Sequence, residues 1–260
     1  MIERYFHSQL SQGAVECVVA ALMALLVMAI AERRGVGLLR ELPLAQLRGI
    51  LQIVAVGAVL ALLLRGPAWT SLIALAAMML AAASIVRSRA RLIRGSFLLA
   101  LVSICAGAGS VLAVMIAAGI LPLRITMLVP VGSMVIAQTM NMQSIFLDRF
   151  RGEVVSHTGE IESALALGAS AETAVSIYLR AAYKASLIPS IDSIRSLGIV
   201  WIPGIMAGMV LSGASPVYAA LYQFVVISII FSAAALTCLT CSALVTGRIF
   251  NADEQLLLRP

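Results

Sequence analysis

Long apolar runs alternate with short polar segments along most of the chain. Seven of these runs predict transmembrane helices, at about 12–31, 47–64, 68–86, 95–118, 124–147, 196–213 and 216–246. Each supplies about 20 mainly apolar residues, the length that spans a bilayer as a helix. The Gly- and Pro-containing segments 119–122 and 213–216 predict tight turns between helices. We therefore expect an all-α, polytopic bundle of about seven spans, forming one domain over residues 1–260.

The positions of Arg and Lys predict the orientation of this bundle. Fifteen of the 18 basic residues fall in one alternating set of loops, and the other set holds Arg4, Arg65 and Arg124. Cytoplasmic loops of membrane proteins carry an excess of Arg and Lys. We expect the richer set in the cytoplasm, with the N-terminus outside and the C-terminus inside, as an odd number of spans requires.

The composition supports the membrane assignment and excludes several other classes. The chain is 62% hydrophobic and 12% charged, whereas a soluble domain is about half apolar and a quarter charged. The net charge of +6 comes from short clusters between apolar runs with few aromatic residues, which argues against nucleic-acid binding. The first apolar run ends in Glu32-Arg33-Arg34 rather than a small-residue cleavage site, so no cleaved signal peptide is expected.

Enzyme motifs are missing from the sequence. The only lysine is Lys184, outside any glycine-rich phosphate loop, and the only histidines, His7 and His157, form no His-Glu-x-x-His motif. We expect a transport protein that neither hydrolyses ATP nor binds a cofactor itself.

The longest polar segment, Asp148–Arg195, has a helical pattern rather than the composition of a linker. Residues 160–167 and 171–187 read as two helices with a break at Gly168–Ser170, where Ser170 can cap the second helix. A short helix, a glycine turn and a second helix predict a rigid cytoplasmic projection at about 148–195, which can dock on a partner.

Several motifs resemble a known family of transporters. Glu162-Ser163-Ala164-x-x-x-Gly168 resembles the first half of the coupling loop of ATP-binding-cassette (ABC) permeases, which docks on the ATPase subunit. The segments 185–193 (ASLIPSIDS), 198–200 (GIV) and 203–208 (PGIMAG) resemble the Fet-type iron-export and plant aluminium-sensitivity permeases. This resemblance covers nearly the whole chain. In the fifth helix, Ala137 and Gln138 stand where the family pattern has Gly-Asn.

The resemblance implies a permease subunit of an ABC exporter that moves iron or another metal outward. It implies a homodimer in the bacterial plasma (inner) membrane, powered by a separate ATPase that binds ATP and Mg. Residues expected to couple to that ATPase are Glu162, Ala164, Leu167, Gly168, Ala169 and Ser170. An ATP-independent secondary transporter or channel is the alternative, and a metal ion, a metal chelate and a sugar nucleotide all remain open as substrates.

Polar side chains and methionines inside the apolar runs are candidates for a substrate path, because polar groups in a membrane usually face the protein interior or a pathway. The candidates are Gln52, Gln138, Met140, Asn141, Asp192 and Met206. Gln138 and Asn141 are three residues apart and share a helical face. For the amides, hydrogen bonding between helices is an equally good interpretation. Asp192 is as well explained by a local ion pair with Arg195.

Two further patterns concern packing and metal binding. Gly204, Gly208 and Ser212 recur every four residues, a spacing that lets two helix backbones approach closely in lipid, and Ala106–Gly109 is similar. Cys238 and Cys241 share a helical face and suit a soft metal. Two sulfurs do not complete a coordination sphere, and buried cysteines are ordinarily small hydrophobic residues.

Overall fold

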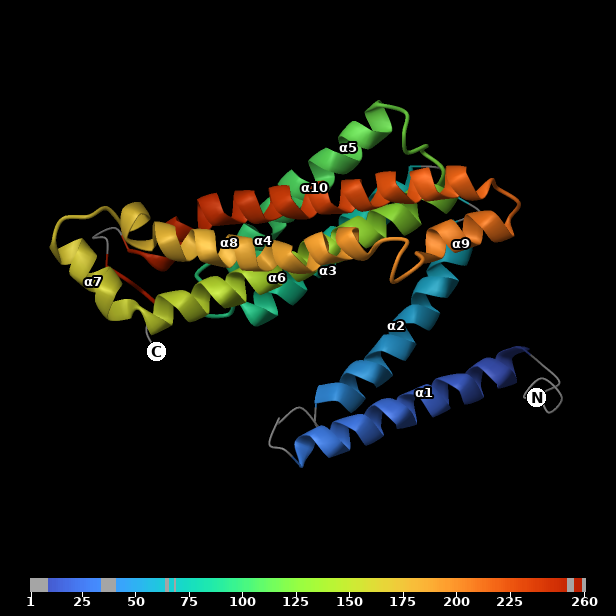
Figure 1. Cartoon of the computed structure of the whole chain (residues 1–260), viewed down its shortest axis with the longest axis horizontal. Coiled ribbons are helices and arrows are strands. Elements are labelled where there is room, and N and C mark those ends of the chain that lie inside the picture. Colours follow the sequence, from blue (N-terminus) through green and yellow to red (C-terminus); the bar gives the residue numbers. More distant parts are fainter. Residues whose placement is uncertain (1–8, 34–40, 64–65, 68, 252–254, 259–260) are drawn as a thin grey trace. The chain divides into compact units, whose positions relative to one another are not determined.

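The computed structural model describes residues 9–33, 41–63, 66–67, 69–251 and 255–258, and these form helices without strands (Figure 1). The chain divides into two units, Met1–Gly66 and Pro67–Pro260. The first contains α1 (Gln9–Glu32) and α2 (Glu41–Leu63). The segment Gln12–Ile30 is long and apolar enough to cross a membrane and has no buried residue, so its apolar side chains are available to lipid or to another protein surface.

The second unit is a helical bundle built around one long central helix. Its helices are α3 (Thr70–Arg89), α4 (Ser96–Ile104), η2 (Cys105–Gly109), α5 (Ser110–Ala117), α6 (Ile125–Ser156), α7 (Thr158–Ala166), α8 (Ala171–Ser196), α9 (Gly204–Leu211) and α10 (Pro216–Ile249). The central helix, α6, packs against α3, α8 and α10; α8 and α10 run beside it in Figure 1. Phe146 and Phe150 of α6 stack in the core with ring centroids 6.1 Å apart.

A π-helical turn, η2, packs closely against α10. It joins α4 to α5, and π-turns of this kind widen a helix locally. A Cβ at Gly107 would lie 2.0 Å from Oγ1 of Thr237 and 2.6 Å from the carbonyl oxygen of Ala233. The backbones of η2 and α10 therefore approach each other at a position that accepts only glycine, as the small residues 106–109 predicted.

The predicted packing role of Gly204, Gly208 and Ser212 is not fulfilled within the described chain. No atom of it lies within 4 Å of a Cβ built at Gly204 or Gly208, and the hydroxyl of Ser212 donates to the carbonyl of Gly208 in its own helix at 2.8 Å. Their small side chains leave this face of α9 open, so a packing role for them needs a surface outside the described residues.

Five helices, rather than seven, are long and apolar enough to span a membrane in the described part of the chain: 12–30, 70–89, 96–117, 125–156 and 216–249. The second expected span contains a shorter apolar helix, Pro43–Gly57. The predicted helix 196–213 is wrong: α8 ends at Ser196, residues 197–203 are not helical, and α9 has only 8 residues. The cause is that α8 extends further than its polar sequence indicated, because one face of it is buried against α6 and α10.

The loop between α3 and α4, the turn between α7 and α8 and the end of α10 lie at one end of the second unit, which we call the basic end. Most of α8, predicted as part of a cytoplasmic projection, instead packs along α6 and α10. A Cβ at Gly95, between α3 and α4, would lie 2.5 Å from a guanidinium nitrogen of Arg248 at the end of α10. Ser170, before α8, shares a surface depression with Asn251, just after α10. The two predicted turns exist, with Gly119 at φ 70° and Gly213 at φ 91°. Which end faces the cytoplasm stays a prediction.

Candidate functional site

A break at residues 197–203, between α8 and α9, interrupts the helical backbone, and Ile199 and Val200 within it are exposed. Gly198 adopts φ 75°, its N–H donates to the carbonyl of Trp201 at 3.1 Å, and the indole N–H of Trp201 donates to Oγ of Ser196 at 3.2 Å. Two residues of the break, Trp201 and Pro203, line a cavity.

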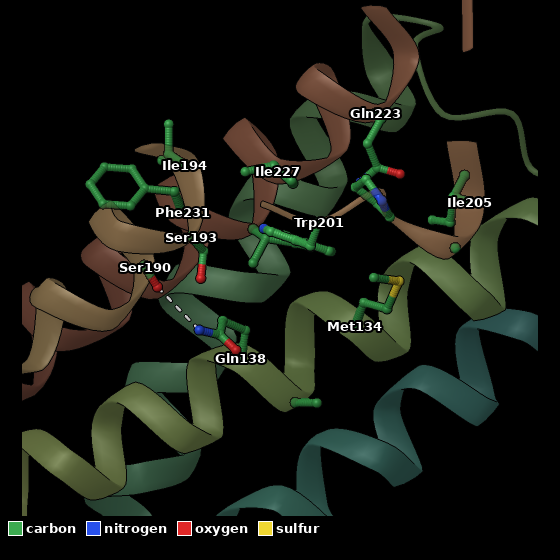
Figure 2. A pocket seen from close by; sticks show the side chains of 14 residues that line it. Met134, Gln138, Ser190, Ser193, Ile194, Trp201, Ile205, Gln223, Ile227 and Phe231 are labelled. Atoms are coloured by element: carbon green, nitrogen blue, oxygen red, sulfur yellow. Dashed lines mark hydrogen bonds between the residues drawn. The ribbon is translucent and has the colours of Figure 1, made fainter. Parts of the chain in front are cut away.

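The cavity has a volume of about 320 Å³ and lies between α6, α8, the break, α9 and α10. Figure 2 shows Gln138, Ser190 and Ser193 on one side of it and Met134, Ile205 and Gln223 on the other. Most of the remaining wall is apolar, formed by Ala137, Ile194, Trp201, Pro203, Gly204, Ile227, Ile230 and Phe231. A largely apolar pocket with a few convergent polar groups is typical of a small-molecule binding site.

Amides and hydroxyls supply the polar groups of the cavity. Nε2 of Gln138 donates to Oγ of Ser190 at 3.1 Å, and that hydroxyl contacts the sulfur of Met142 at 3.1 Å. Gln223 is 2% exposed, and its Oε1 has no hydrogen-bond partner in the described chain. A buried, unpaired amide oxygen costs about 1–3 kcal/mol, so a ligand that donates a hydrogen bond to it recovers this loss.

The cavity includes one of the six predicted path residues. Gln138 lines it, whereas Asn141 is exposed and Met140 packs against the core. Because Gln138 faces the cavity and Asn141 does not, the two residues do not form the shared polar lining that their spacing predicted. Met206 lies on α9 without lining the cavity, and Gln52 belongs to the first unit.

Asp192 faces away from the cavity and pairs with Arg195, as one of its two interpretations predicted. The pair is 3.8 Å long, with the Asp192 side chain 63% and the Arg195 side chain 78% exposed. Asp192 lies two residues after Ser190 on α8, and Ser190 is hydrogen-bonded to Gln138 of α6. Gln138 lies about 20 Å along the helix axis from Ile125, the first residue of α6. This exposed ion pair therefore lies beside the middle of α6, a helix that is long and apolar enough to cross a membrane, and a charged side chain facing hydrocarbon costs several kcal/mol.

Cys238 and Cys241 are both fully buried in α10. Oγ of Ser186 lies 3.9 Å from the sulfur of Cys238. Among the described residues, no third His, Cys, Asp or Glu joins them to form a group that could hold a metal ion. The pair therefore packs as two small hydrophobic side chains in this structure.

The turn between α7 and α8 presents an apolar tip at the basic end. Leu167 is 89% exposed, Gly168 adopts φ 90°, and Ser170 caps α8 by accepting from the N–H of Thr173 at 3.3 Å. The predicted break and cap are therefore confirmed. Glu162 is exposed on α7, whereas Ala164 packs partly against the core. We call Leu167–Ser170 the tip.

Side-chain contacts hold the tip rigidly on the bundle. The hydroxyl of Tyr178 on α8 donates to Glu160 on α7 at 2.9 Å, and its ring stacks on His157 with centroids 4.8 Å apart. Ile161 and Val175 are buried beneath these contacts. Desolvation, reinforced by the carboxylate of Glu160, raises the pKa of Tyr178 above its ordinary value, so the phenol remains a donor across the physiological range.

Among the cavity residues, Gln223 and Trp201 were not predicted as site residues, and Ser190 was named only within the family motif 185–193. Gln223 carried a usable signal, because it is the single amide side chain in the 34 residues of α10 and polar groups within a span are rare. Ser190 and Trp201 carried none, since serine and tryptophan are ordinary in membrane helices and at their ends.

These features define a class first: an integral membrane protein with several apolar helices, a broken helix lining a cavity, and an exposed tip at the basic end. A family model described as "Uncharacterised protein family (UPF0014)" matches residues 14–250, and the chain belongs to this family.

Relatives in bacteria and plants agree with this assignment. The chain is 31% identical to "UPF0014 membrane protein YjkA" of Bacillus subtilis, covering 85% of this chain and 88% of the relative. It is 30% identical to "Probable iron export permease protein FetB" of Escherichia coli, covering 66% of each. It is 27% identical to "Protein ALUMINUM SENSITIVE 3" of Arabidopsis thaliana, covering 94% and 90%.

The resemblance to iron-export and aluminium-sensitivity permeases is thus confirmed, and the bacterial relatives agree with a bacterial plasma membrane. No solved structure gives a significant match.

Proposed function

We propose that this chain is the permease subunit of an ABC exporter that moves iron or another metal out of the cell, driven by a separate ATPase subunit that holds ATP and Mg. The observation that carries the proposal is the tip, where Leu167 is 89% exposed on a turn that is rigidly held by its neighbours. Inserting this exposed leucine into a groove of a partner protein would remove its apolar surface from water, which favours docking.

One helix connects the tip to the cavity. α8 begins just after Ser170, and its residues Ser190, Ser193 and Ile194 line the cavity about 30 Å away along the helix axis. Pro189 lies inside α8 and removes one backbone hydrogen bond beside Ser190. A push on the tip is thereby delivered to the hydrogen bond between Ser190 and Gln138, which closes one side of the cavity.

The exposed charges of α8 support a homodimer. Lys184, Asp192 and Arg195 line one depression on the outer face of this helix, and the pair Asp192–Arg195 lies beside the middle of α6. A second copy placed against this face shields the charges from lipid and can present its own Asp192 to Arg195. The open face of α9 at Gly204 and Gly208 can add close backbone contact to the same dimer.

Replacing Leu167 tests the role of the tip. Burying a leucine side chain contributes about 2 kcal/mol, which is roughly a 30-fold change in Kd. Leu167→Asp should therefore lower co-purification of the ATPase at least 30-fold and raise cellular iron under iron stress. Leu211→Asp is the matched control, because Leu211 is 88% exposed at the other end of the bundle; it should leave the ATPase bound.

If the two variants retain the ATPase equally, the tip is not the site where the ATPase docks. If deletion of the gene leaves cellular iron unchanged, the proposal that the substrate is a metal is wrong.

The broken helix α8–α9 favours the alternative of an ATP-independent transporter, since discontinuous helices are common in secondary transporters. Transport by the purified chain alone in liposomes, without an ATPase, would establish this alternative instead.

A further inference from the structure

We propose that the cavity between α6, α8, α9 and α10 binds an uncharged organic ligand, so that a metal leaves this permease inside a neutral chelate and not as a free ion. This inference rests on the proposed export function and specifies the chemical class of its substrate.

The first argument is the charge of the cavity wall. Its 14 lining residues include no Asp, Glu, His, Lys, Arg or Cys, and no group of three or more His, Cys, Asp or Glu exists among the described residues. A bare Fe²⁺ in such a wall would lose its hydration shell without gaining a counter-charge, which costs many kcal/mol. Carboxylates supply the negative charge in the oxygen sites that hold hard cations in proteins, whereas this wall supplies only uncharged groups: amides, hydroxyls, an indole and one thioether.

The second argument is the helix end that faces the cavity. Gly204 and Ile205, the first residues of α9, both line it. The first N–H groups of a helix have no partner within it and carry a partial positive charge. This end of α9 disfavours a cation further and suits a carbonyl or ether oxygen of an organic ligand.

The third argument is Gln223, which points to a ligand independently of the helix end. Its side chain is 2% exposed, lies at the cavity wall opposite Ser190 in Figure 2, and leaves Oε1 without a hydrogen-bond partner in the described chain. Together with Gln138 and Ser193, it offers both donors and acceptors to one molecule. The apolar walls of Ile227, Phe231 and their neighbours then fit the hydrocarbon part of that molecule.

Equilibrium binding of radioactive iron to the purified full-length chain tests the inference. Iron is offered as the uncharged tris-maltolate complex of Fe³⁺, as free Fe²⁺ kept reduced, and as the anionic citrate complex. The neutral complex should bind at least tenfold more tightly than either of the others. Competition by iron-free maltol shows which part of the complex the cavity recognises. If maltol displaces the labelled complex, the organic molecule is sufficient for binding; if it does not, the cavity recognises the whole chelate.

Variants connect the binding to the cavity. Gln223→Leu should weaken binding of the neutral complex about tenfold, which corresponds to one lost hydrogen bond. The control is Gln143→Leu, because Gln143 is also a fully buried amide but lies outside the cavity; binding should stay within twofold. Gln223→Glu should shift the preference toward Fe²⁺, since it places a carboxylate in the wall.

Free Fe²⁺ or the citrate complex binding as tightly as the neutral complex overturns the inference, as does failure of the neutral complex to bind. An equal loss of binding in Gln143→Leu and Gln223→Leu overturns the cavity as the site. A chain that co-purifies with an ATPase and lowers cellular iron, but binds only free Fe²⁺, refutes this inference and leaves the proposed function standing.

Discussion

The contact of Gly107 with α10 allows a sharp test of the bundle. An alanine at this position places its Cβ 2.0 Å from Oγ1 of Thr237 and 2.6 Å from two backbone atoms, the carbonyl oxygen of Ala233 and the nitrogen of Thr237. A side-chain hydroxyl can rotate away from the new methyl group. The backbone atoms cannot, so η2 and α10 must separate.

Overpacking of a well-packed interior costs about 1–3 kcal/mol, and we expect the upper value because the helix backbone of α10 has to move. For a chain of this size, about 3 kcal/mol lowers Tm by roughly 6–12 °C. The movement also loosens the packing of buried Ala108 and Ala233, which lie in the core next to this contact.

Thermal unfolding of the purified chain in detergent, followed by tryptophan fluorescence, measures this effect. Gly109→Ala is the matched control: it lies in the same π-turn, and the nearest atom to its new Cβ is the terminal methyl carbon of Met79 at 3.9 Å. That variant should unfold within about 1 °C of the parent chain. Adding Thr237→Ala to Gly107→Ala should restore part of the stability, because it removes the nearest of the three contacts.

Equal Tm values for Gly107→Ala and Gly109→Ala would refute the close approach of η2 and α10. Full rescue by Thr237→Ala would show that only the hydroxyl, and not the backbone of α10, opposes the methyl group.

Three smaller effects follow from other contacts of the described chain. Gly132→Ala should cost only about 1 kcal/mol in unfolding free energy, because its Cβ meets the flexible end of Leu75 at 2.6 Å. Ser170→Ala removes the cap of α8 and should cost about 1 kcal/mol, visible as faster amide exchange in the first turn of α8. The raised pKa of Tyr178 means that its stabilisation is present below pH 10.0, the ordinary pKa, and is lost as pH rises through the higher folded value; Tyr178→Phe should abolish that loss above pH 10 and free α7 from α8.

The sequence predicted the helices whose side chains are mainly of one kind, namely apolar. Apolar runs located the helices that the structure describes as α1, α3, α4 to α5, α6 and α10, and the glycines of the turns at 119 and 213 marked their ends. Gly168 and Ser170 likewise predicted the break and the cap of the coupling segment. These signals are local: a helix that crosses lipid must be apolar, and a left-handed turn residue is best supplied by glycine.

α8 was the element that local signals misjudged. Lys184, Asp192 and Arg195 placed the predicted helix 171–187 in a cytoplasmic projection, and the next apolar residues were predicted as a separate span from 196. The structure buries Ala182, Ser186 and Ser190 on one side of α8 and leaves the charges on the other. Hydropathy averages the two sides of a helix, so a helix with one buried face and one charged face at membrane depth scores as a loop.

The sequence by itself determined that this protein lies in a membrane, that its helices are joined by glycine turns, and that a capped turn follows Leu167. Only the tertiary structure decided which polar groups meet. It brought Gln138, Ser190 and Gln223, which are 85 residues apart from first to last, to one cavity, and it turned Asp192 away from them. The physical reason is that apolarity and turn chemistry are properties of neighbouring residues, whereas a cavity depends on how four helices and one break pack against one another.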